Sequence, residues 1–156
     1  MNDEGGYDLE DLMPGMSACF SKTLSEHDVR LFASATGDRN PMHLNETYAQ
    51  RTFFGGRIAH GMLSASVISA AIATHLPGPG SIYLSQDLQF RRPVRLGETV
   101  CATVTVKEIL ASRRRVVLET RCEVDGLVVV EGTAVVMPTN AAARRKEAAR
   151  VQDQEA

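Results

Sequence analysis

The sequence predicts an α+β domain in which one long central helix is wrapped by an antiparallel β-sheet. Residues 61–76 are small or apolar and include no acid, lysine or arginine. After residue 80 the chain is rich in β-branched residues, and Asp125-Gly126 is typical of a β-hairpin turn. A buried helix followed by hairpin-connected strands indicates a sheet that packs on the helix.

The N-terminal part is expected to hold a tail, a strand and a helix. Residues 1–16 are rich in Gly, Asp and Glu, and we expect a flexible N-terminal tail there. A weak alternation predicts a first strand over residues 17–24. Ser25 can cap a following helix, whose less polar side chains recur at helical spacing, and Gly37 suits the position that ends it.

The apolar helix follows a short helix and a loop. Asn45 is expected to cap the short helix, and residues 53–59, with their glycine pair, are expected to form the loop. The 61–76 helix is apolar or small on every face, so burial on all sides is expected. Because one sheet covers only one side of a helix, we predict a homodimer. Residues 77–80, Pro-Gly-Pro-Gly, end the helix.

The rest of the domain is expected to be β-structure. Strands are expected over residues 81–92, 98–109, 114–124 and 127–137. We therefore predict a single domain over residues 17–138. Residues 139–156 contain mostly Ala, Arg, Lys, Glu and Gln, and they are expected to form a C-terminal tail, either as a solvated helix or frayed.

Composition excludes several classes of function. A formal net charge of −2 gives no global basic surface, so neither nucleic acid nor a membrane is expected as a partner. No apolar run reaches transmembrane length, and the acidic N-terminus lacks the order of a signal peptide. Cys19, Cys101 and Cys122 cannot all pair within one chain and form no Cys-x-x-Cys motif. This pattern favours reduced thiols in a cytoplasmic protein.

Residues 37–43, Gly-Asp-Arg-Asn-Pro-Met-His, place a carboxylate and an imidazole on one short segment. Taken alone, Asp38 is more simply a turn residue and His43 a packed histidine. Taken together they are a candidate acid/base pair, because Pro41 stiffens the loop and could hold both side chains toward one pocket. Asn40 could bond the loop backbone and fix that geometry.

The dipeptide His60-Gly61 stands at the start of the apolar helix. In the simpler interpretation Gly61 allows a close turn, and His60 is an interfacial or capping residue. In the functional interpretation, the first amides of the helix lack internal partners and carry partial positive charge. Because Gly61 has no Cβ, a ligand carbonyl could approach its N–H closely, which would make an oxyanion site for a thioester.

Arginine clusters offer a possible contact to a charged ligand. Arg91-Arg92 and residues 113–115 are more often solvated charges than ligand contacts. A coenzyme A phosphate would nevertheless favour such side chains at the mouth of a pocket. The glycine-rich stretches at 55–56 and 77–80 lack the spacing of phosphate or dinucleotide loops.

Three motifs give the sequence a family resemblance. Residues 37–43 have the pattern Gly-Asp-x-Asn-Pro-x-His, residues 60–63 are His-Gly-Met-Leu, and residues 93–98 have the pattern Pro-Val-x-x-Gly-Glu. In this order they resemble the (R)-specific enoyl-CoA hydratases, which are MaoC-type dehydratases of the hot-dog fold. The first pattern is the signature of these hydratases, and the similarity runs from about Ser21 to about Pro138.

The resemblance implies a fold and a set of site residues. The fold would be a hot-dog, with subunits paired edge to edge into a homodimer and sites near the interface. Asp38 and His43 would be the catalytic dyad, with Asn40 holding their loop. The Gly61 amide would bind the thioester oxygen, and Ser69 would lie in the pocket and orient Asp38.

The function that we expect is reversible syn hydration of a trans-2-enoyl-CoA to an (R)-3-hydroxyacyl-CoA. No metal and no organic cofactor are expected, because the thioester already activates the double bond and coenzyme A is part of the substrate. Ile72 on the helix and Val135 on the last strand are expected to line the far end of the acyl pocket.

Three other functions remain open. The nearest is a 3-hydroxyacyl-thioester dehydratase that acts on acyl carrier protein. A hot-dog thioesterase is less favoured, because its carboxylate would stand on or beside the central helix and residues 61–76 contain no acid. A non-catalytic acyl-CoA-binding subunit would be expected to have lost the dyad, whereas both of its residues are present.

Overall fold

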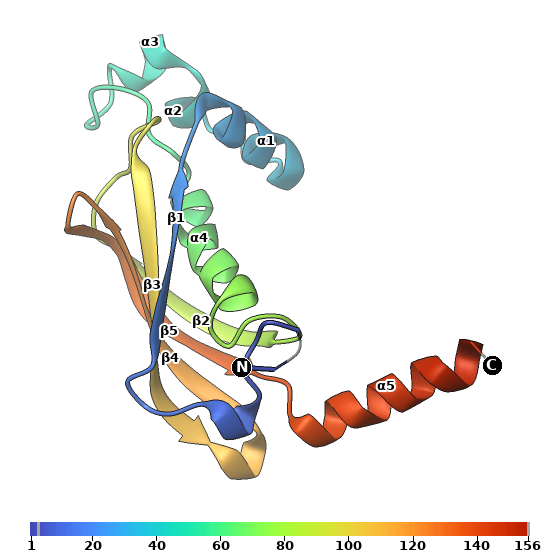
Figure 1. Cartoon of the computed structure of the whole chain (residues 1–156). Helices are drawn as coiled ribbons and strands as arrows, with labels where there is room; N and C mark the ends of the chain where they lie inside the picture. Colours follow the sequence, from blue (N-terminus) through green and yellow to red (C-terminus); the bar gives the residue numbers. More distant parts are fainter. Residues whose placement is uncertain (3, 156) are drawn as a thin grey trace.

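A computed structural model describes residues 1–2 and 4–155, and it shows one long helix packed against one sheet (Figure 1). The predicted strands and the two longer predicted helices are all present, with ends within two residues of those expected. In chain order the elements are η1 (Leu9–Asp11), β1 (Ser17–Thr23), α1 (Glu26–Thr36), α2 (Pro41–Leu44), α3 (Glu46–Ala49), α4 (Gly61–Thr74), β2 (Ile82–Phe90), β3 (Thr99–Leu110), η2 (Ala111–Arg113), β4 (Arg115–Val124), β5 (Leu127–Met137) and α5 (Ala141–Glu155).

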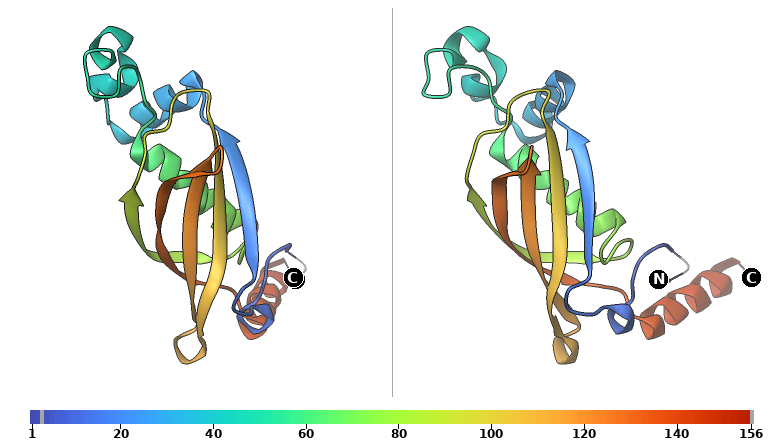
Figure 2. Two further views of the ribbon diagram at one scale, coloured as in Figure 1. Left: turned by 90° about the vertical axis from the view of Figure 1, so that its left-hand side faces the viewer. Right: turned by 60° about the vertical axis from the view of Figure 1, so that its left-hand side comes forward.

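The five strands form one antiparallel sheet in the order β1-β3-β4-β5-β2. β1 and β2 are therefore its two edges. Side chains along β3 and β4 alternate between buried and accessible positions, so each strand presents one face to the core. The sheet curves around α4, as Figure 2 shows from two directions.

α4 lies across the concave face of the sheet, mainly over β1, β3 and β4. Its inward face is fully buried and consists of Ser64, Ala65, Val67, Ile68, Ala71 and Ile72. Its outward face stays accessible, and Met62 on that face exposes 56% of its surface. Within one chain the helix is thus buried on one side only, although its composition favours burial on all sides.

α1 begins and ends where its capping residues predict. The Ser25 hydroxyl accepts a hydrogen bond from the Asp28 amide (3.2 Å), and the Asp28 carboxylate accepts one from the Ser25 amide (2.8 Å). Gly37 ends the helix with a φ of +81°, a conformation that glycine adopts without strain. The short helix α2 is not predicted by the sequence pattern. It forms because Pro41 occupies its first position, where no amide is needed, and Asn40 caps it.

The two terminal segments meet at the end of the sheet opposite to α2 and α3 (Figure 1). The Leu9 amide donates to the Thr139 carbonyl (2.8 Å), and Arg144 binds the buried carboxylate of Asp8 at 2.6 Å. This guanidinium holds the pKa of Asp8 at about 2. Asp8 and Leu9, within the segment that composition predicts to be a flexible tail, therefore have defined partners in the domain.

The state of the cysteines and the character of the helices bear on where the protein could act. Cys19, Cys101 and Cys122 are free thiols, and burial raises the pKa of Cys122 to about 12. No helix in the described ranges combines the length and the apolar character that crossing a bilayer requires.

The close approach of β2 to β5 depends on Gly132. A Cβ at this position would lie 1.9 Å from the Asp87 carbonyl oxygen, which is backbone and cannot swing away. Gly132→Ala is therefore expected to lower the free energy of unfolding by about 3 kcal/mol or more, measured by urea denaturation. Thr133→Ala, on the same strand, is the control, and its expected effect is below about 1 kcal/mol. Equal stability of the two variants would contradict this packing.

Candidate active site

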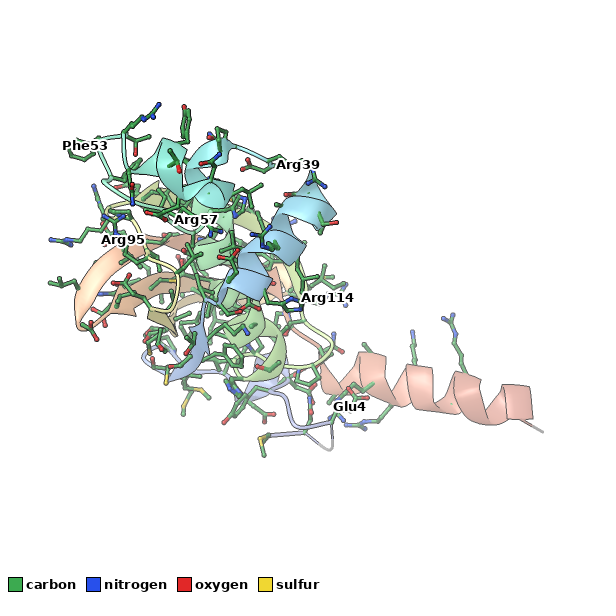
Figure 3. The ribbon with its side chains drawn as sticks, turned by 90° about the horizontal axis from the view of Figure 1, so that it is seen from above. Glu4, Arg39, Phe53, Arg57, Arg95 and Arg114 are labelled. Atoms are coloured by element: carbon green, nitrogen blue, oxygen red, sulfur yellow. The ribbon has the colours of Figure 1, made fainter. Side chains whose placement is uncertain are left out.

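Two arginines fasten the 53–59 loop to the domain beside the N-terminus of α4. The Arg57 Nε donates to the His43 carbonyl at 2.7 Å. Arg95 donates to two carbonyls of the loop. Figure 3 shows Arg57 in the middle of this end of the molecule and Phe53 at its outer edge. The loop is thus held by side chains from two different parts of the chain.

The N-terminus of α4 presents an amide without a partner. Gly61 is its first residue and is exposed, and within residues 1–2 and 4–155 its N–H has no hydrogen-bond acceptor. The Phe90 ring packs so closely on Gly61 that a Cβ there would lie 2.9 Å from it. Because the first amides of a helix carry partial positive charge, the Gly61 N–H is suited to hold a carbonyl oxygen that gains negative charge.

Asp38 lies in the loop between α1 and α2, with its side chain exposed. Its carboxylate accepts a hydrogen bond from the Asn40 amide (3.2 Å), and the Asn40 side chain accepts one from the Met42 amide (3.2 Å). Asn40 therefore acts on the loop by capping α2. These local hydrogen bonds reduce the conformational freedom of the loop and restrict the direction of the Asp38 side chain.

His43 lies in α2 and is buried, with 6% of its surface accessible. Its Nδ1 is 2.9 Å from the Ile58 carbonyl, which can only accept, so Nδ1 carries the proton and Nε2 keeps a lone pair. Burial lowers the pKa of His43, and a charge on His60 would lower it further. The Ile58 carbonyl and the Asp38 charge act in the opposite direction. The net effect favours a neutral ring that can accept a proton.

His60 is a site residue whose role the sequence does not predict. It precedes α4 and is 1% exposed, but its side chain makes no capping bond to the helix. Instead its Nε2 is 3.0 Å from the Asp38 carbonyl, and its ring lies 4.0 Å from the His43 ring between centroids. The His-Gly dipeptide before the helix is the only sequence signal of this position, and it does not show which loop the ring contacts.

The structure brings together the carboxylate and imidazole that the sequence proposes as an acid/base pair. One oxygen of Asp38 and one ring nitrogen each of His43 and His60 lie within 4.8 Å of one another. One water molecule could bridge such groups. The same spacing would also accept a divalent cation, although one nitrogen of each ring already contacts a backbone carbonyl.

Within a single chain, the structure does not bring three other expected site residues together with Asp38 and His43. Ser69 is exposed on the outward face of α4, and no hydrogen bond joins it to Asp38 in the described chain. Ile72 is buried under the sheet, in the core. Val135 stands between the buried residues Ala134 and Val136, so its side chain points to the opposite face of the sheet. Ile72 and Val135 therefore do not line one acyl pocket within the chain.

A pocket of about 330 Å³ opens beside the N-terminus of α4. Gly61 and Ser64 lie on its wall, and most of the other residues around it are apolar: Phe53, Phe54, Ile58, Ala59, Phe90, Pro93, Val94 and Val130. Arg91 and Arg92 also line it, whereas residues 113–115 do not. Arg91 pairs with Glu131 at 2.7 Å, and Arg92 donates to the Val128 carbonyl at 3.0 Å.

Comparison with known proteins gives the chain close relatives. A family model described as "MaoC like domain" matches residues 13–127. The chain is 55% identical over 129 residues to the (R)-specific enoyl-CoA hydratase of Rhodospirillum rubrum, covering 83% of this chain and 90% of that protein. It is 50% identical over 128 residues to the 3-hydroxybutyryl-CoA dehydratase of Methylorubrum extorquens, covering 82% of each.

The fold is shared with a solved relative. The unliganded R-hydratase PhaJ1 of Pseudomonas aeruginosa superposes with a TM-score of 0.82 at 46% sequence identity. The superposition covers 86% of this chain and 87% of that one. The sheet and its central helix therefore have the hot-dog fold of this solved hydratase.

The buried position of His43 predicts how it titrates. Its pKa is expected to lie below the ordinary value of 6.5, so the ring gains its proton only as the pH falls below that value. NMR titration of the ring protons measures this directly. Because the Asp38 charge raises the pKa of His43, Asp38→Asn is expected to lower it further. A His43 pKa at or above 6.5 in the unchanged protein would contradict the geometry.

Proposed function

The chain belongs to the MaoC-like dehydratase family, and from this premise we propose that it is an (R)-specific enoyl-CoA hydratase. The reaction is reversible syn hydration of a trans-2-enoyl-CoA to the (R)-3-hydroxyacyl-CoA. One observation carries the proposal: the Asp38 carboxylate and a His43 ring nitrogen lie within 4.8 Å, at the end of the domain where α4 begins. The names of the two sequence relatives, a hydratase and a dehydratase, describe the two directions of one reaction.

The proposed mechanism begins with a water molecule held between Asp38 and His43. The Nε2 lone pair of His43 removes a proton from this water, and its oxygen forms a bond to C3 of the enoyl group. The electrons of the double bond move toward the thioester oxygen, where the Gly61 N–H stabilises the negative charge. C2 then takes a proton from the dyad on the same face, so water adds across the bond in a syn manner.

In the proposed mechanism no step needs a metal or an organic cofactor. Conjugation with the thioester makes C3 electrophilic, so a base, an acid and one oxyanion donor complete the reaction. The apolar pocket beside Gly61 gives the non-reacting part of the substrate a place to bind. Three free thiols favour a reducing compartment, and we propose the cytoplasm as the location.

We propose that the active form is a homodimer. β2 is a sheet edge with exposed apolar side chains, and Ile82 and Phe90 expose 51% and 52% of their surfaces. The outward face of α4 is small or apolar, and it includes Met62 and Ser69. Edge-to-edge pairing through β2 would continue the sheet and cover both surfaces. Ser69 would then lie between the subunits.

The first test is hydration of crotonyl-CoA, followed by loss of absorbance of the conjugated thioester. Asp38→Asn and His43→Ala are each expected to lower kcat/KM by on the order of 10²–10⁴, because each removes one partner of proton transfer. Asp11→Asn and His27→Ala replace the same residue types at accessible positions outside this cluster, and they are expected to keep the activity.

The products separate the alternatives. Release of free thiol would make the protein a thioesterase instead. No reaction with enoyl-CoA, but reaction with the enoyl-acyl carrier protein, would make it a carrier-protein dehydratase. A folded His43→Ala variant with unchanged activity on crotonyl-CoA would show that Asp38 and His43 are not the catalytic pair.

The second test concerns self-association. Sedimentation should give twice the mass of the 17.0 kDa chain. Ile82→Lys is expected to weaken the dimer at least about tenfold, or about 1.4 kcal/mol, because it places a charge in the proposed interface. Leu127→Lys is the matched control, since Leu127 is as exposed (55%) but belongs to β5, an inner strand. A monomer at micromolar concentration, or equal weakening by both changes, would contradict the β2 interface.

A further inference from the structure

His60 contacts both of the residues to which the proposed function assigns proton transfer, Asp38 through its backbone and His43 through its ring. Its Nε2 donates to the Asp38 carbonyl at 3.0 Å, because a carbonyl oxygen can only accept. Its ring lies against the His43 ring, with 4.0 Å between centroids and 33° between planes. The first contact fixes the backbone of Asp38. The second limits the rotation of the His43 ring.

Besides Asp38 and His43, His60 is also linked to the Gly61 amide, because the two residues are adjacent in the chain. His60 directly precedes Gly61, whose amide begins α4. The position of its ring is therefore tied to the position of the oxyanion donor through a single peptide bond. On its outer side the ring packs against Phe32 of α1, with 4.9 Å between centroids. His60 thus has little freedom to move while α1 and α4 stay in place.

We propose, on the basis of the proposed function, that His60 is a positioning residue that sets Asp38 and His43 relative to the Gly61 amide. In this proposal His60 takes no part in the proton transfer itself. It connects the Asp38 loop to α4, whereas the other bonds of the loop are to its own residues and to Thr36 at the end of α1. A displacement of about 1 Å in such a constellation lowers rates by on the order of 10²-fold.

The unsatisfied half of the ring argues against a purely structural role. His60 Nδ1 is buried and has no hydrogen-bond partner among the described residues. A buried polar atom without a partner destabilises a fold, so an apolar residue of similar size would serve packing at least as well. Two features explain a histidine at position 60. Its Nε2–H donates to the Asp38 carbonyl, and its flat ring packs against the His43 ring, so both contacts hold residues of the candidate active site.

Three variants separate positioning from packing. His60→Leu keeps an apolar side chain but removes the donor to Asp38. His60→Gln can place an amide N–H where Nε2–H stood, so it is the conservative variant. Phe32→Leu is the matched control, because it disturbs the other side of the same ring and leaves the hydrogen bond in place.

The expected result is a loss of rate without a loss of fold. With crotonyl-CoA, His60→Leu should lower kcat by on the order of 10²-fold, with KM changed less than about threefold, since the dyad acts in the transition state. Its melting temperature should equal or exceed that of the unchanged protein. His60→Gln should recover most of kcat, and Phe32→Leu should keep it. Unchanged kcat in His60→Leu, or equal losses of kcat in His60→Leu and Phe32→Leu, would overturn the proposal.

A structural measurement keeps this inference separate from the proposed function. Crystal structures of His60→Leu and His60→Gln report the separation between the Asp38 carboxylate and the His43 ring. We expect it to exceed 4.8 Å in the leucine variant and to be kept in the glutamine variant. If the unchanged protein hydrates no enoyl-CoA, the proposed function fails, but this separation still decides whether His60 positions the pair. An unchanged separation in His60→Leu would overturn the inference.

Discussion

α4 packs its inward face into the curve of the sheet, and this burial determines where the first amides of the helix point. Val67, Ile68 and Ile72 are each at most 3% exposed, and burial of such side chains stabilises a fold by about 1.5–3 kcal/mol each. The sheet in turn is curved enough to surround the helix (Figure 2). Gly61 is therefore held by the core of the domain, although the residue itself is exposed.

Short hydrogen bonds hold the two residues proposed to act on the substrate, Asp38 and His43, close to the N-terminus of α4. The Ile58 carbonyl fixes the tautomer of His43, and the Asp38 carbonyl accepts from His60. Arg57 holds the backbone of His43 from the other side. In each case a backbone carbonyl is the acceptor, in a loop for Ile58 and Asp38 and in α2 for His43, so these segments gain order from the same bonds that orient the side chains. A site built in this way combines loop residues with the rigidity of the core.

The sequence predicts most of the fold, because its signals there are local. Alternation and turn residues locate the strands, and Ser25 and Gly37 locate the ends of α1. The spacing of Asp38 and His43 suggests an acid/base pair, the family motif strengthens this hypothesis, and the structure brings the two side chains together. A side chain's direction within a sheet is harder to predict. Val135 is on the outer face, because strand register is set by pairing with β2 and β4.

Contacts between distant segments could not be predicted. His60 and Asp38 are 22 residues apart, and Asp8 and Arg144 are 136 apart. No periodicity or motif connects such pairs, since only the tertiary fold brings them together. α2 is missed for a different reason: a proline interrupts helical patterns in sequence, yet it fits the first position of a new helix.

We propose above all that Asp38 and His43 add the hydroxyl group of water to C3 and a proton to C2 on the same face of an enoyl-CoA. Hydration of crotonyl-CoA in deuterium oxide, with the stereochemistry of the product determined by NMR, tests this most directly. We expect (R)-3-hydroxybutyryl-CoA, with one deuterium at C2 placed by syn addition. An (S) product, anti addition or release of free coenzyme A would contradict it.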